Sequence, residues 1–197
     1  MNKLARFACL LSVITLVGCA HPITITPNLS TIDRKNVTPI DKNAGYFISD
    51  QDRENKVITP GGGGDKVEYT PYKDIEPALQ KVLSNLFAKV YKVPSPEDTK
   101  FIADNDLAFV FVPRVQTTSS SSGIMTWMAT DFTLILDCKA IDRSGKVVWE
   151  DSISKSGHAE FNEMMETGDY QLSSRRASEA VFLSLQEQLN SNATFRR

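Results

Sequence analysis

The chain has 197 residues, 41% of them hydrophobic and 23% charged, with 22 lysines and arginines against 24 aspartates and glutamates. This length fits a single globular domain, and this composition excludes a chain that is disordered throughout. The net charge of −2 comes with no basic stripe and no aromatic platform flanked by basic residues, so nucleic acid is not an expected partner.

The first 18 residues, 1–18, have the three parts of a signal peptide. Lys3 and Arg6 give a positive start, residues 7–17 are apolar, and a small glycine follows. The apolar run is too short for a helix that crosses a bilayer core, which needs about 20 residues. We therefore expect a leader that is removed, not a transmembrane span.

The end of this leader, Leu16-Val17-Gly18-Cys19, resembles a bacterial lipobox. The resemblance implies cleavage between Gly18 and Cys19 and lipidation of Cys19, which would attach the protein to a membrane. The alternatives are an ordinary secretory leader or a cysteine placed there by chance. In lipoproteins of this kind the residue after the cysteine helps decide the destination, and Ala20, not aspartate, implies the periplasmic face of the outer membrane.

Residue types that carry chemistry are sparse in the rest of the chain. Of the three cysteines, Cys9 leaves with the leader and Cys19 would carry lipid, so Cys138 has no partner for an internal disulfide. Cys138 lies in a strand-like run, which favours a buried structural thiol. His21 and His158 are too few for a zinc site, and no Gly-x-Ser-x-Gly motif is present. We expect no catalytic residue, no metal and no cofactor.

The residues after the leader divide into three parts. Residues 19–43 are rich in proline, threonine and asparagine without a regular period, which indicates a lipidated N-terminus followed by an extended tether. The alternative is that residues 23–26 form an edge strand against the body. Residues 44–191 are expected to form one periplasmic domain, and residues 192–197 a tail.

The first half of this domain shows three short strand patterns, at residues 45–49, 56–59 and 66–70. Four glycines at 61–64 separate the second strand from the third. They do not fit a phosphate-binding loop, because Asp65 follows them and no helix starts there. We expect a flexible hairpin connection.

Two helices and a buried strand are predicted next. Apolar residues at spacings of three and four predict an amphipathic helix over residues 74–92, with Asp74 as its N-cap. Ser95 is placed as the cap of a second, two-turn helix. The continuous apolar run at 107–112 is typical of a central strand buried on both faces.

A low-complexity loop at 117–123, with four serines in a row, leads into a group of bulky apolar residues: Ile124, Met125, Trp127 and Met128. In the functional interpretation this group is a mobile apolar tip that contacts lipid or a partner protein. In the alternative interpretation, Trp127 and its neighbours begin the next strand and pack on the core.

The remainder reads as a hairpin followed by a helix. Alternating apolar and polar residues predict a strand at 132–140. A turn with a well-placed glycine is predicted at 142–145, and it joins this strand to a second strand at 147–153. Ser173 or Ser174 is placed as the cap of a last helix. The expected fold class is α+β: a mostly antiparallel sheet with two main helices packed on one face.

Several of these features together resemble the small outer-membrane lipoproteins of the YajG and LPS-assembly-lipoprotein kind. They are the lipobox, the helix over 74–92, the Asp106-Leu107 start of a buried strand, the turn at 142–145 and the last helix. The resemblance implies a layer of two helices over a sheet, and only the lipobox is a specific motif. No binding residues can be carried over from it.

Two functions follow as expectations. The first is a non-enzymatic accessory or binding protein in envelope assembly or maintenance, held by the membrane through Cys19 and contacting an envelope protein or glycolipid. The second is an envelope hydrolase or other enzyme whose active site has no recognised motif.

Overall fold

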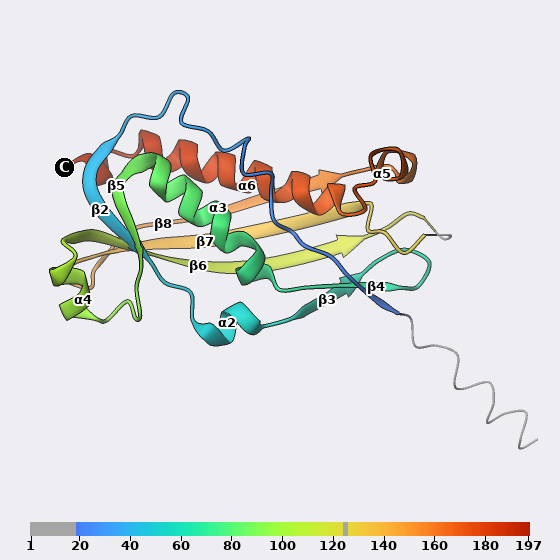
Figure 1. The fold of residues 1–197 in the computed structure, drawn as a ribbon, viewed down its shortest axis with the longest axis horizontal. Coiled ribbons are helices and arrows are strands. Elements are labelled where there is room, and N and C mark those ends of the chain that lie inside the picture. The colour runs from blue at the N-terminus through green and yellow to red at the C-terminus, as the bar shows by residue number, and fades with distance from the viewer. Residues whose placement is uncertain (1–18, 124–125) are drawn as a thin grey trace, which may run out of the picture.

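The computed structural model describes residues 19–123 and 126–197, which form a sheet with two long helices on one face (Figure 1). The α+β class is confirmed. The elements, in chain order, are β1 (Ala20–Pro22), β2 (Ile40–Tyr46), α2 (Asp50–Glu54), β3 (Val57–Pro60), β4 (Lys66–Tyr69), α3 (Pro71–Leu86), β5 (Phe87–Lys92), α4 (Thr99–Asp104), β6 (Leu107–Ser120), β7 (Asp131–Asp142), β8 (Val147–His158), α5 (Phe161–Thr167), α6 (Leu172–Ser191) and the short 3-10 helix η1 (Ala193–Arg196).

The main sheet has the order β5-β2-β6-β7-β8, and a smaller sheet has the order β1-β4-β3. The main sheet is mixed: β2 runs parallel to both β5 and β6, whereas β6, β7 and β8 are antiparallel. Parallel neighbours require a crossover connection. Here α3 returns the chain before β5, and α4 lies in the connection from β5 to β6.

The helix predicted over 74–92 is shorter and begins earlier. It starts at Pro71, where a missing N–H costs nothing, and the side chain of Asp74 accepts a hydrogen bond from the Ile25 N–H at 3.1 Å. The helix ends at Leu86, and the residues that follow form β5 beside β2. Tertiary pairing therefore outweighs the helical period in this β-prone stretch.

Other element boundaries also differ from the sequence patterns. Asp98, not Ser95, caps α4 by accepting from the Phe101 N–H at 2.9 Å. The buried strand predicted at 107–112 continues to Ser120, because β7 pairs with β6 as far as Asp131. Two of the serines assigned to a loop therefore lie in a strand. The first predicted strand is also displaced: β2 ends at Tyr46.

Residues 19–43 are part of the folded body, and the predicted tether is wrong for them. Ile25 and Ile32 are fully buried, and the Asn85 side chain on α3 donates to the Ile32 carbonyl at 3.1 Å. The Thr38 N–H donates to Asn190 on α6 at 2.9 Å. The two buried isoleucines and these hydrogen bonds hold the segment against both helices. Two isoleucines are too few to give a periodic signal in the sequence. We call residues 23–39 the N-terminal strap.

The predicted tail, residues 192–197, is also part of the core. Phe195 in η1 is 0% exposed. Its ring centroid lies 5.1 Å from that of Phe109, 5.6 Å from Phe111 and 5.9 Å from Trp149. Such edge-to-face and tilted aromatic contacts stabilise a cluster beyond the area that they bury.

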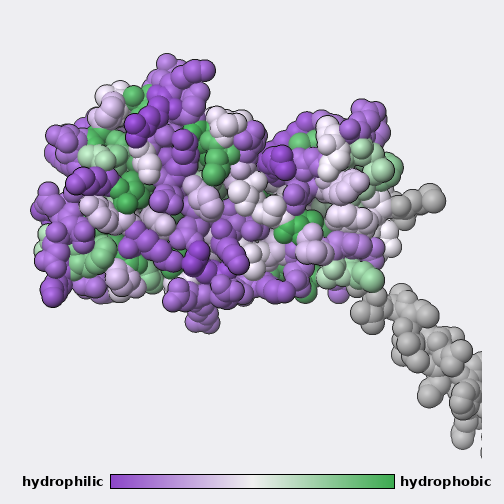
Figure 2. Space-filling view, viewed as in Figure 1, coloured by the Kyte–Doolittle hydropathy of each residue, from purple (hydrophilic) through white to green (hydrophobic). Residues whose placement is uncertain are grey.

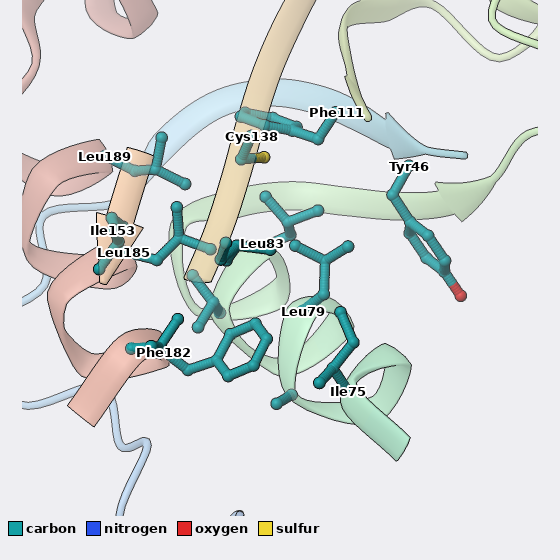
Figure 3. Close-up of a cluster of buried hydrophobic side chains, with 14 of the residues drawn as sticks. Tyr46, Ile75, Leu79, Leu83, Phe111, Cys138, Ile153, Phe182, Leu185 and Leu189 are labelled. Carbon is teal, nitrogen blue, oxygen red and sulfur yellow. The ribbon is translucent and has the colours of Figure 1, made fainter. Parts of the chain in front are cut away.

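The main core lies between the helices and the sheet (Figure 3). The apolar stripe predicted on the first helix is buried as expected, and both helices, with the facing side of the sheet, supply the cluster: Ile75, Leu79, Leu83, Phe111, Cys138, Ile153, Phe182, Leu185 and Leu189. A second cluster lies under α4, where Val93, Ile102, Leu107 and Val110 pack together.

Cys138 lies in the main core, and its burial raises the thiol pKa to about 12. Since the thiolate is the reactive form, we expect no reaction of Cys138 with a thiol reagent at pH 8 in the folded protein, and full reaction after unfolding in denaturant. The measurement is a colorimetric thiol assay on a Cys19→Ser chain without its leader, which leaves Cys138 as its one cysteine. Rapid labelling of the native chain would contradict this placement.

Candidate functional site at the end that bears Cys19

Cys19 is held against the body by Asp65, the residue after the four glycines. The Cys19 backbone N–H donates to Asp65 Oδ1 at 3.1 Å, and His21 Nε2 lies 3.2 Å from Asp65 Oδ2. The Lys66 N–H donates to the Cys19 carbonyl at 2.9 Å, and β1 runs parallel to β4 from Ala20 onward. The lipidation candidate is therefore joined to the small sheet directly.

The four-glycine segment is a hairpin connection between β3 and β4, as predicted. The Gly62 N–H donates to the Trp127 carbonyl at 3.1 Å, and the Gly63 N–H donates to the Gly123 carbonyl at 3.1 Å. A Cβ atom at Gly61 would lie 2.3 Å from the Trp127 carbonyl oxygen. Glycine is required here because the backbones of two loops approach closely. This packing explains the glycines without a bound phosphate.

The predicted contact group is only partly placed by the structure. Ile124 and Met125 lie outside the described residues. Trp127 is half-buried: its ring stacks on His21, with centroids 4.5 Å apart, and lies edge-on to Tyr170 at 6.1 Å. Met128 is 4% exposed and packs with Ala159 and Met164. Met128 therefore belongs to a small satellite core, and the idea of an exposed tip is wrong for this residue.

Exposed apolar side chains are found instead on α5 and just after it. Phe161 is 45% exposed, Met165 is 51% exposed and Tyr170 is 44% exposed. Phe161 and Met165 are four residues apart and so share one face of α5, while Met164 points into the satellite core. The sequence patterns predicted no helix over this stretch. The only signal was this i, i+4 pair, which is weak in so short a helix.

We call this region the Cys19 end; it comprises residues 19–22, 61–65, 126–131 and 158–170. Contacts described above tie its parts together, since Trp127 touches both His21 and Tyr170. Figure 1 shows α5, the β3–β4 connection and the start of β1 at the same end of the molecule. The C-terminus lies at the opposite end.

His158, one of the two histidines, is held between two carboxylates at this end. Its Nδ1 lies 2.8 Å from Asp131 Oδ1, and its Nε2 lies 2.9 Å from Glu160 Oε1. The hydrogen bonds to Glu160 and then Asp131 raise the pKa of His158, and the bond to His158 lowers the pKa of Asp131. Both imidazole nitrogens are therefore engaged in ion pairing.

We expect His158 to titrate above the ordinary histidine value of about 6.5. The charged imidazolium is favoured in the folded state, so its contribution to stability is complete below that ordinary value and is lost as the pH rises through the raised pKa. Proton NMR titration of the ring measures the midpoint. The Asp131→Asn, Glu160→Gln double variant should bring it down, and an unchanged midpoint in that variant would contradict the assignment.

The clamp on Cys19 can be tested by Asp65→Ala. Removing the carboxylate takes away the acceptor of the Cys19 N–H and the partner of His21. We expect faster amide hydrogen exchange over residues 19–23, with little change in exchange over α6. Glu68→Ala is the matched control, because it removes an ion pair between β4 and Lys56, which lies just before β3. Equal exchange at the N-terminus in both variants would show that Asp65 does not hold it.

The face of the sheet away from α3 and α6 is polar along β6, β7 and β8. Its central row holds Arg114, Asp137 and Ser152, with Ser152 Oγ donating to Asp137 Oδ1 at 2.6 Å. An open groove of about 580 Å³ runs over these residues. In the part of the chain that the structure describes, β8 is the last strand of its sheet, so one edge of its 12 residues has no strand beside it.

Residues 19–123 and 126–197 contain no group of three or more His, Cys, Asp or Glu side chains that could hold a metal ion. Within the same ranges, none of the helices combines the length and hydrophobicity needed to span a membrane.

The fold and this end together define an α+β body whose first described residue is a cysteine fixed to a small sheet. No protein-family model matches the chain, and no curated protein matches it. The comparisons also contain no match specific to the YajG kind.

Among solved structures, the chain is similar to the PelC dodecamer from Paraburkholderia phytofirmans, with 13% identity, 79% of this chain and 95% of that chain covered, and a TM-score of 0.46. It is also similar to a minor lipoprotein from Acinetobacter baumannii, with 10% identity, coverage of 77% and 94%, and a TM-score of 0.43. A third similar structure is a neuraminyllactose-binding hemagglutinin homolog from Helicobacter pylori, with 11% identity, 78% of this chain and 86% of that chain covered, and a TM-score of 0.46.

Proposed function

We propose that the protein is a lipid-anchored lipoprotein on the periplasmic face of the outer membrane, acting there without catalysis as an accessory or binding protein of the envelope. The observation that carries the anchor is the lipobox-like run that ends at Cys19. Asp65 accepts the Cys19 N–H, and a free ammonium or an acylated amide nitrogen on Cys19 could each still donate to it. The folded body is therefore compatible with the processed cysteine.

The state of the two residues that sequence analysis weighed as reactive supports a non-catalytic role. Cys138 is buried with its thiol pKa raised to about 12, which disfavours a nucleophilic thiolate. His158 has a carboxylate on each ring nitrogen, so neither nitrogen is free to accept a proton from a substrate in this arrangement.

The edge of β8 is the surface that we propose for a protein partner. A free strand edge presents backbone N–H and C=O groups that a partner's extended segment can pair with. Glu150, Asp151 and Lys155 lie along this strand, and such charges disfavour pairing between copies of the same edge. A specific partner with complementary side chains would overcome them.

In-cell photo-crosslinking tests the accessory role. A crosslinker at Lys155 on β8 should capture a defined envelope protein, whereas one at Lys81, exposed on α3, should not. Captured proteins are identified by mass spectrometry. Capture from neither position, or the same proteins from both, would argue against β8 as a docking edge.

A further inference from the structure

We propose that the Cys19 end lies directly on the bilayer, with Phe161, Met165 and Tyr170 in contact with the lipid interface and the long axis of the main sheet pointing away from it. This inference rests on the proposed lipidation of Cys19. It differs from the tethered arrangement expected from sequence, in which the body would stand free of the membrane.

The first step is that Cys19 is joined to the folded body without a flexible linker. Cys19 itself is fixed by Asp65 and Lys66, and β1 pairs with β4 from the next residue. His21 is two positions after Cys19, which is at most about 7 Å of extended chain. Acyl chains on Cys19 would therefore leave from the surface of the body.

The second step is the place of the exposed apolar side chains. His21 stacks on Trp127, and Trp127 contacts Tyr170, so Tyr170 lies within two ring contacts of the anchoring strand. Phe161 and Met165 project from the exposed face of the adjoining α5. Amphipathic aromatic rings are favoured at the boundary between lipid and water. Figure 2 shows white and pale-green surface at this right-hand end of the molecule.

The third step is charge, which decides what kind of lipid surface fits. Acidic residues surround α5, and three of them are paired: Glu160 with His158, Glu163 with Arg176, and Asp169 with Arg175 at 3.2 Å. Glu166 is exposed on the same helix. Because no excess of positive charge gathers here, the contact should depend on apolar burial and should not strengthen with anionic lipid.

The two tryptophans are natural reporters of this orientation. Trp127 belongs to the Cys19 end, whereas Trp149 pairs with Ala140 and contacts Phe195 toward the opposite end. Trp149 and His158 are nine positions apart on β8, which is about 30 Å of strand. A bilayer that touches one end of the body would therefore be far from the other reporter.

The experiment uses the full, lipidated chain in vesicles of phosphatidylethanolamine and phosphatidylcholine that contain brominated phospholipid as a short-range quencher. Trp149→Phe leaves Trp127 as the single reporter, and Trp127→Phe leaves Trp149. We expect several-fold stronger quenching of Trp127 than of Trp149, unchanged when anionic lipid is added. Equal quenching of both, or none of either, would overturn the proposal.

A second pair of variants tests the apolar contact. The Phe161→Ser, Met165→Ser double variant should lower the quenching of Trp127 at least twofold, because it removes the side chains that hold this end in the interface. Val147→Ser is the matched control, since Val147 is 43% exposed at the turn between β7 and β8. If both variants leave the quenching unchanged, α5 does not touch lipid.

The mass of the N-terminal peptide separates this proposal from the proposed function. A peptide without added lipid means that the anchor itself is wrong. A lipidated peptide with no quenching of Trp127 means that the body stands away from the membrane. A crosslinker at Met165 that captures one envelope protein instead of phospholipid would make this end a protein-docking face, and would also overturn the bilayer proposal.

Discussion

Replacing Cys19 with serine is expected to move the protein from the membrane fraction to the soluble periplasmic fraction. Each buried CH₂ of an acyl chain contributes about 0.8 kcal/mol, and one chain anchors only marginally while two hold stably. The exposed apolar surface of α5 is too small to replace such an anchor. The measurements are fractionation of cells that express each chain, and uptake of a labelled fatty acid.

Cys9→Ser is the matched control, because Cys9 lies in the predicted leader and its loss leaves the lipobox-like run unchanged. This variant should remain in the membrane fraction and take up label. A Cys19→Ser chain that still fractionates with membranes, together with a native chain that takes up no label, would refute the anchor.

Truncating Phe195 to alanine is expected to be among the most destabilising single changes near the C-terminus. The ring is fully buried and contacts Phe87, Phe109, Phe111 and Trp149 from three different strands, β5, β6 and β8. Removal of a buried phenylalanine side chain costs about 3–5 kcal/mol through lost transfer energy and the cavity left behind. Urea unfolding of the soluble body, followed by circular dichroism, measures the shift of the midpoint.

Phe161→Ala provides the comparison for this prediction. The same atoms are removed from a side chain that is 45% exposed on α5, so the free energy of unfolding should change by only about 0.5 kcal/mol. Similar losses in the two variants would mean that η1 is not docked in the core as described.

The parts of the fold that sequence predicted are those with strong local signals. The stripe of α3 repeats at helical spacing, and the turn at 142–145 has Gly145 at a φ of +81°, where glycine is favoured. The strand before this turn alternates cleanly and forms β7, and the strand after it forms β8. Each signal lies within a window of a few residues, so no tertiary information was needed.

The parts that sequence did not predict depend on partners far along the chain. Residues 87–92 keep a helical period, yet they form β5 because β2 lies beside them. Ile25 and Ile32 are two isolated apolar residues whose burial requires both long helices. Parallel pairing of β2 with β6 depends on a crossover that leaves no local pattern.

The candidate site divides in the same way. Cys19 was singled out from the sequence because the lipobox-like run is a local pattern, whereas the clamp by Asp65 joins residues that are 46 positions apart. The apolar face of α5 could not be predicted from the sequence, because a helix of 7 residues contains barely two turns in which a periodic pattern can appear.

If the protein is exported as proposed, the N-terminal strap constrains the order of events. Its Asn28 N–H donates to Glu179, and Gln186 donates to the Asp33 carbonyl, both across more than 150 positions of sequence. These partners lie on α6, more than 150 positions further along, so the strap cannot dock until that helix has also emerged. Under the proposed processing, the residues beside the cleavage site therefore stay open to the modifying enzymes while the rest of the chain emerges.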